Sequence, residues 1–125
     1  MNKTILLIAG GYNQVSLAKE IINQGYSLIL VDPNIECPCS KYANTQLLHD
    51  TRFYLDILKS IEEQNLEIDG VISDQSDAAL KSVSIVAEKL GLIHKNLSFI
   101  NNSLNKANQY KILYNNKIKV PKTYQ

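Results

Sequence analysis

The sequence predicts an α/β protein built on a doubly wound parallel sheet, and three observations predict it. Apolar runs of strand length alternate with segments whose apolar residues recur at helical spacing. The connections between these runs are long enough for parallel crossovers. A glycine pair follows the first run, and acidic residues follow the second and the fourth. Because parallel strands end at the same edge of a sheet, we expect these residues to gather at one carboxyl edge.

The first strand, turn, helix and second strand are the clearest elements. Residues 4–9 are almost all apolar, as in a strand that is buried on both faces of a parallel sheet. Gly10 and Gly11 follow at once and let the backbone turn sharply and approach a ligand closely. The next segment has helical spacing and ends at Gly25, and residues 27–31 form the second apolar run.

A third strand and a second helix come next. Asp32-Pro33-Asn34 ends the second run, and residues 45–49 are expected to form a short third strand. Asp50 or Thr51 then offers an N-cap for a helix. The apolar face of this helix is expected to comprise Tyr54, Leu55, Leu58 and Ile61.

A fourth strand and another helix complete the predicted domain. Residues 68–73 form the fourth apolar run, and Ser76 and Asp77 begin a helix that ends at Gly91. Crossovers of the usual right hand then give a sheet in which the first strand lies between the second and the fourth. The predicted strand order is 3-2-1-4.

The tail departs from this alternation. Residues 104–114 are expected to form a helix that carries Lys106 and Lys111 on neighbouring turns. Residues 118–121 begin an extended segment that has no partner to pair with, so the chain is expected to be cut within a larger protein. We therefore expect a first domain over residues 1–102.

Composition excludes several classes of function. The chain has 125 residues, which suits one main domain, and its hydrophobic share of 45% and charged share of 20% are typical of soluble globular proteins. A net charge of +1 gives no electrostatic argument for binding nucleic acid or an anionic membrane. No apolar run is long enough to span a bilayer and no signal peptide is evident, so we expect a cytoplasmic protein.

The sequence predicts no metal site. Cys37 and Cys39 lie in one proline-containing loop, and the only histidines, His49 and His94, are not at finger-like spacing from them. Two thiols need two further ligands to make a zinc site. Reduced loop thiols are the expectation for a cytosolic chain.

Several short motifs occur in a characteristic order. They are Gly10-Gly11-Tyr12-Asn13-Gln14, Gln24-Gly25-Tyr26, Asp32-Pro33-Asn34, Pro38, Ala43-Asn44, Asp50, residues 69–72, Ser76-Asp77, residues 87–92, Asn105-Lys106, Lys111 and residues 120–124. Through these motifs the chain resembles the N-terminal region of ATP-grasp ligases, of the kind found in biotin carboxylase, the carbamoyl-phosphate synthase large subunit and ATP-dependent enzymes of purine synthesis. Three positions depart from the pattern, namely Asn44, Ile93-His94 and Lys119.

The resemblance implies a fold and a chemistry. The fold is a Rossmann-like pre-ATP-grasp domain over residues 1–102, followed by the start of the ATP-grasp domain over residues 103–125. In this family ATP phosphorylates a carboxylate or bicarbonate to an acyl phosphate, which an amine or another nucleophile attacks. The complete enzyme uses ATP and Mg²⁺. This chain is expected to bind neither, to contain no catalytic residue and to be inactive alone.

The candidate site residues each have a structural alternative. The substrate-binding candidates are Gly10, Gly11, Gln14, Asp32, Asp74, Ser76 and Asp77. The glycine amides can face an anionic group or merely turn the chain. Gln14 can bind substrate or be solvated, Asp32 can bind a ligand or cap the Pro33 turn, and acids at a helix N-terminus are stabilising without any function. By resemblance Lys106 meets nucleotide phosphates, whereas Lys111 is a surface charge.

Two other functions remain open at this stage. A dinucleotide-binding Rossmann domain would use the same glycine turn with Asp32 as ribose partner, although Gln14 stands where that motif has glycine. A standalone non-catalytic module that binds a small ligand or a partner is the third possibility.

The family also forms dimers through its first domain, and the helix expected over residues 51–64, with Phe53 and Tyr54, is the candidate contact.

Overall fold

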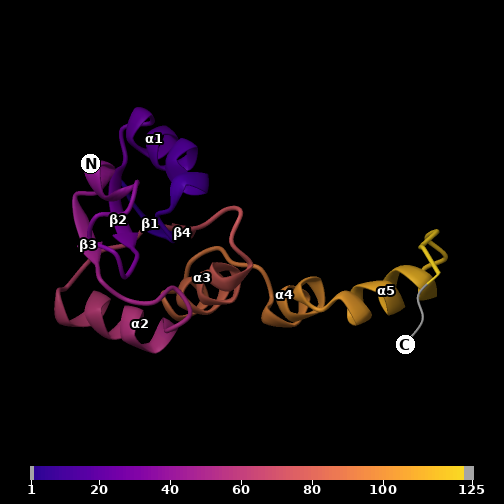
Figure 1. The fold of residues 1–125 in the computed structure, drawn as a ribbon. Coiled ribbons are helices and arrows are strands. Elements are labelled where there is room, and N and C mark those ends of the chain that lie inside the picture. Colours follow the sequence, from indigo (N-terminus) through magenta and orange to yellow (C-terminus); the bar gives the residue numbers. More distant parts are fainter. Residues whose placement is uncertain (1, 123–125) are drawn as a thin grey trace.

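The structure is a computed structural model that describes residues 2–122. It contains a four-stranded sheet in which all neighbouring strands are parallel, in the order β3-β2-β1-β4 (Figure 1). The strands are β1 (Thr4–Ile8), β2 (Ser27–Val31), β3 (Thr45–Leu47) and β4 (Gly70–Ile72). The predicted fold class and strand order are confirmed.

Helices lie on both faces of this sheet. On one face are α1 (Val15–Asn23), which continues the short helix η1 (Tyr12–Gln14), and a loop containing η2 (Ser40–Tyr42). On the other face are α2 (Tyr54–Glu63) and α3 (Asp77–Lys89). The sheet is therefore doubly wound.

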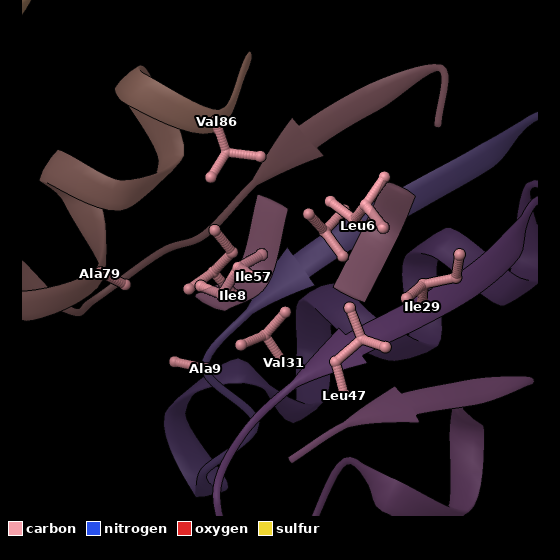
Figure 2. Close-up of a cluster of buried hydrophobic side chains, with 10 residues drawn as sticks. Leu6, Ile8, Ala9, Ile29, Val31, Leu47, Ile57, Ala79 and Val86 are labelled. Carbon is pink, nitrogen blue, oxygen red and sulfur yellow. The ribbon is translucent and has the colours of Figure 1, made fainter. Parts of the chain in front are cut away.

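The alternation of side chains along β1 explains why its sequence is apolar throughout. Leu6 and Ile8 belong to the hydrophobic cluster under α2 and α3, which Figure 2 shows. Leu7, which lies between them, belongs to the cluster under α1. All three side chains are completely buried, because successive residues of a strand face opposite sides and both sides are covered here.

The C-terminal part differs from the prediction. The helix expected over residues 104–114 is present as α5 (Lys106–Asn115), but it is preceded by a helix that was not predicted, α4 (Leu97–Leu104). The break lies at Asn105, which has extended backbone angles and accepts a hydrogen bond from the Asn108 amide at 3.0 Å. An asparagine that caps a new helix interrupts the preceding one. Figure 1 shows α4 and α5 projecting away from the sheet.

The start of α2 also differs. Asp50 does not cap this helix; its carboxylate forms an ion pair with Arg52 at 2.7 Å, which lowers the pKa of Asp50 to about 2. The helix begins at Tyr54 and buries Ile57 and Ile61. Leu55, expected on the apolar face, is 69% exposed. The third and fourth strands are shorter than expected.

Two further observations concern the chain as a whole. No helix among residues 2–122 is long and apolar enough to cross a membrane. The motif predicted over residues 120–124 ends in Thr123 and Tyr124, which lie outside the described residues.

Candidate functional site at the carboxyl edge of the sheet

The turn after β1 is made by a residue other than the two glycines. Ala9 has φ of +83°, a left-handed conformation that is uncommon for a residue with a side chain. Its amide donates a hydrogen bond to the Val31 carbonyl at 2.9 Å. Gly11 has φ of −74° and ψ of −177°, which any residue adopts. Backbone strain is therefore stored at Ala9 rather than at the glycine pair.

Gly10 is required for packing. A Cβ atom at this position would lie 2.9 Å from both Cys37 Sγ and Leu30 Cδ1. Both neighbours are buried side chains of the core, so they have little room to move. At Gly11 a Cβ atom would meet only Gln14 Oε1, at 3.3 Å.

Both glycine amides already have partners within the chain. The Gly10 amide donates to Asp32 Oδ2 at 3.0 Å, and the Gly11 amide donates to Gln14 Oε1 at 2.9 Å. Both amides are therefore engaged within the chain in this conformation, and their contact with a ligand stays a prediction. Asp32 Oδ1 also accepts from the Asn34 amide at 2.9 Å, so the capping role expected for Asp32 is confirmed.

Gln14 connects two loops at the carboxyl edge. Its side chain is only 5% exposed, so the alternative of a solvated glutamine is wrong. Its Oε1 atom accepts a hydrogen bond from the Gly11 amide, and its Nε2 group donates one to the Asp74 carbonyl at 2.8 Å. The glycine turn after β1 and the loop after β4 are thus joined by a single buried side chain.

The loop between β4 and α3 supplies the remaining candidates. Ser76 caps α3, since its Oγ atom accepts from the Ala79 amide at 3.3 Å, and Asp77 is the exposed first residue of that helix. Gln75 is left-handed, with φ of +50°. Asp74 Oδ1 is buried and has no hydrogen-bond partner among the described residues. An unpaired buried carboxylate oxygen is uncommon and can accept a hydrogen bond from a ligand.

Sequence reasoning missed Cys39, which lies directly beneath the turn. Its amide donates to the Gly10 carbonyl at 3.0 Å and its thiol to the Gly11 carbonyl at 3.6 Å. Complete burial raises the pKa of the Cys39 thiol to about 11, and the charges of Cys37, Asp32 and Asp74 add to this effect. The Cys39 thiol therefore stays protonated at neutral pH while it contacts the glycine turn. No local sequence signal pointed to this contact.

The raised pKa of Cys39 predicts a loss of stability at alkaline pH. The pKa rises from 9.0 to about 11 on folding, so the folded state keeps a proton that the unfolded state releases. The contribution of this thiol to the free energy of unfolding is complete below pH 9.0 and falls as the pH approaches 11. Urea unfolding across this range measures the effect. Cys39→Ser is the control, and equal pH slopes for the variant and the unsubstituted chain would refute the prediction.

The structure does not bring Lys106 to this edge. Lys106 is the exposed first residue of α5, and Figure 1 places α5 well away from the sheet. Lys111 is exposed on the same helix, as expected for a surface charge. The other candidates lie near the carboxyl ends of β1, β2 and β4: Gly10, Gly11, Asp32, Asp74 and Ser76 in the loops that follow these strands, Gln14 at the end of η1 and Asp77 at the start of α3.

The described residues contain no cluster suited to a metal ion. Within residues 2–122 no group of three or more histidine, cysteine, aspartate or glutamate residues is arranged to bind one. Cys37 and Cys39 are free thiols and both are buried.

Comparison with known proteins places this fold. No family model matches the chain. A curated N5-carboxyaminoimidazole ribonucleotide synthase from Staphylococcus saprophyticus is 29% identical over 85 residues, which are 66% of this chain and 23% of that protein. The structure of phosphoribosylglycinamide synthetase from Anaerococcus prevotii has a TM-score of 0.80 at 20% identity, covering 94% of this chain and 30% of that one. For N5-carboxyaminoimidazole ribonucleotide synthetase from Thermotoga maritima the TM-score is 0.75 at 21% identity, covering 96% and 32%.

These structural similarities establish the fold. The chain has the fold of the N-terminal domain of these synthetases, which confirms the predicted resemblance to ATP-grasp enzymes at the level of the fold. The chain spans 23% of the curated relative and about a third of each structure that it matches.

Proposed function

We propose that this chain is the N-terminal part of an ATP-dependent ligase of the ATP-grasp kind. The observation that carries the proposal is the extent of the structural match, which covers 94% and 96% of this chain but only 30% and 32% of two such ligases. The order of the sequence motifs supports the same assignment. On this proposal the chain alone is inactive, because it is one part of a larger catalytic unit in the cytoplasm.

The carboxyl edge contributes to the site for the reactant that is not a nucleotide. That reactant is a small carboxylate, or bicarbonate, or the nucleophile that attacks its acyl phosphate. We expect the bound reactant to donate a hydrogen bond at this edge. Asp74 Oδ1 is an acceptor without a partner among the described residues, whereas the amides of Gly10 and Gly11 are already engaged. Gln14 fixes the two loops around this position.

The second domain begins near residue 103. The projection of α5 from the sheet and the exposure of Ile112, Leu113 and Tyr114 support this division, since such apolar surface is usually covered in a complete protein (Figure 1). On this division, Lys106 contacts the phosphates of a nucleotide that is bound in the second domain. On this proposal the rest of the complete enzyme supplies the acidic ligands of Mg²⁺, together with the phosphates of ATP.

The test is activity of the complete protein with and without Gly11→Val. The full reading frame should consume Mg-ATP in the presence of a carboxylate and an amine, and residues 1–125 alone should not. Gly11→Val should abolish turnover with little change in melting temperature, because the valine side chain projects where a ligand approaches and the backbone at Gly11 is unstrained. Gly11→Ala is the matched smaller change.

Three outcomes of this test separate the explanations. Full activity of Gly11→Val would mean that the turn has only a structural role. A complete protein that never consumes ATP with any acid and amine pair would refute the ligase assignment itself. A complete protein that oxidises or reduces a nicotinamide cofactor would favour the dinucleotide-binding alternative.

A dimer contact through α2 is also part of the proposal. Phe53 and Leu55 are 53% and 69% exposed, so this end of α2 presents apolar surface, whereas Tyr54 packs against the core. We expect sedimentation equilibrium to show a dimer at high micromolar concentration and Leu55→Asp to shift it to monomer. A monomer at that concentration before substitution would contradict this contact.

A further inference from the structure

A groove lies beside the glycine turn, on the face of the sheet that α1 covers. One wall is formed by Tyr12, Val15 and Lys19, whose spacing puts them on one side of η1 and α1. The other wall is the loop that contains η2, including Ser40, Lys41 and Tyr42. The hollow has a volume of about 680 Å³. We call it the α1–η2 groove; it is distinct from the carboxyl-edge position beside Asp74.

The loop wall is fixed by hydrogen bonds. Ser40 Oγ lies 3.1 Å from Cys37 Sγ and donates to Gln46 Oε1 at 2.8 Å. Gln46 Nε2 in turn donates to the Asn34 carbonyl at 2.9 Å. The opposite wall is a regular helix. Because both walls are ordered before any ligand arrives, little conformational entropy is lost on binding.

The side chains in the groove combine aromatic surface with positive charge. Tyr12 is 88% exposed, so the face of its ring is accessible to a ligand. Lys41 Nζ lies 5.3 Å from the centroid of the Tyr42 ring. Neither Lys19 nor Lys41 forms an ion pair with any carboxylate within residues 2–122. Glu36 is the one acidic residue of the lining, so the two cations outnumber it.

We propose that the α1–η2 groove binds a planar aromatic anion. The ring stacks on Tyr12, and the anionic group pairs with Lys41 or Lys19. The site lies beyond the proposed ligase function, since it needs neither the carboxyl edge nor a second domain. A nucleoside monophosphate and an aromatic carboxylate share this chemistry, and the probes are chosen to distinguish them.

The experiment is a titration of ¹⁵N-labelled residues 1–125 followed by amide NMR. The probes are adenosine 5′-monophosphate, 4-hydroxybenzoate, adenosine and inorganic phosphate. We expect saturable shifts at Tyr12, Lys19 and Lys41 with one or both aromatic anions, and at least about fivefold weaker binding of adenosine and of phosphate, because each lacks one of the two interactions. The anion that binds more tightly shows whether the groove prefers a nucleoside monophosphate or an aromatic carboxylate.

Variants with matched controls test the assignment of residues. Tyr12→Ala and Lys41→Gln should each weaken binding about fivefold or more. Tyr26→Ala, a tyrosine in a different hollow beside β4, and Lys81→Gln, a lysine of α3 on the opposite face, should leave it unchanged. Circular dichroism confirms that each variant is folded.

Several results would overturn the proposal. One is the lack of saturable shifts with either aromatic anion at millimolar concentration. Another is phosphate binding as tightly as the monophosphate, which would indicate a simple anion site. Shifts confined to residues 73–77 would place the ligand at the carboxyl edge instead. None of these results bears on whether the complete protein is a ligase.

Discussion

Gly10→Ala should lower the free energy of unfolding by about 2–3 kcal/mol, whereas Gly11→Ala should change it by less than about 1 kcal/mol. The added methyl group at Gly10 would lie 2.9 Å from Cys37 Sγ and from Leu30 Cδ1. Leu30 is completely buried in the cluster under α1, and Cys37 is 6% exposed. Relief of this overlap requires movement of β2 or of the loop after it, because close-packed cores do not absorb an extra carbon freely.

Gly11→Ala is the internal control because it adds the same methyl group one residue away. Its backbone angles suit alanine, and its nearest contact is 3.3 Å from the amide oxygen of Gln14, which needs to give by only a few tenths of an ångström. Urea unfolding of both variants measures the difference. Equal destabilisation would show that the pair acts only by backbone flexibility and that close packing at Gly10 is unimportant.

The fold was predictable because it depends on local patterns that repeat. The two central strands, β1 and β2, are almost entirely apolar. Because the segments between the strands have helical spacing, residues 4–9 and 27–31 indicate a parallel sheet without any long-range information. The tail was predicted less well. Asn105 alone does not predict where a helix begins, since asparagine occurs both inside and between helices. Its role is visible only in the structure, where its side chain caps α5 by accepting a hydrogen bond from the Asn108 amide.

The position of the candidate residues at one edge of the sheet was predictable, but the hydrogen bonds among them were not foreseen. The sequence placed Gly10, Asp32 and Asp74 at one edge, and they are there. The bond from the Gly10 amide to Asp32 spans 22 residues, and the bond from Gln14 to the Asp74 carbonyl spans 60. Contacts of such separation leave no periodic signal in the chain. The left-handed Ala9 was equally hidden, because alanine has no preference for that conformation.

The same bonds weaken the dinucleotide-binding alternative. In that fold the turn approaches a pyrophosphate with free amides, and the acid after the second strand binds ribose. Here the amides of Gly10 and Gly11 are engaged by Asp32 and Gln14, and the second oxygen of Asp32 caps the Pro33 turn. A dinucleotide would have to displace three internal hydrogen bonds. A reactant that donates to Asp74 displaces none of them.

Gln14→Met should destabilise the chain by about 2–4 kcal/mol and loosen the carboxyl edge. Methionine has a similar volume and remains compatible with the buried position, but it cannot accept from the Gly11 amide or donate to the Asp74 carbonyl. Two backbone groups near the surface of the core then lose their partners, and each unpaired group costs about 1–3 kcal/mol, partly offset where water can enter.

The loosening should be local as well as global. Gln14 is the buried side chain that connects the glycine turn to the loop before α3, so its loss allows the two loops to separate. We expect amide hydrogen exchange to accelerate at Gly11 and Ala79 more than at Leu7 and Leu30, which lie in the centre of the sheet. If exchange accelerated equally at all four amides, the glutamine would contribute only to overall stability.

Gln75→Ala is the matched control for this prediction. Gln75 also links the two loops, since its Nε2 group donates to the Asn13 carbonyl at 3.3 Å, but its side chain is exposed and the bond is longer. Water can replace that bond, so we expect a change in the free energy of unfolding below about 0.5 kcal/mol. A loss for Gln75→Ala as large as that for Gln14→Met would mean that the number of bonds between the loops, and not the burial of Gln14, determines the rigidity of this edge.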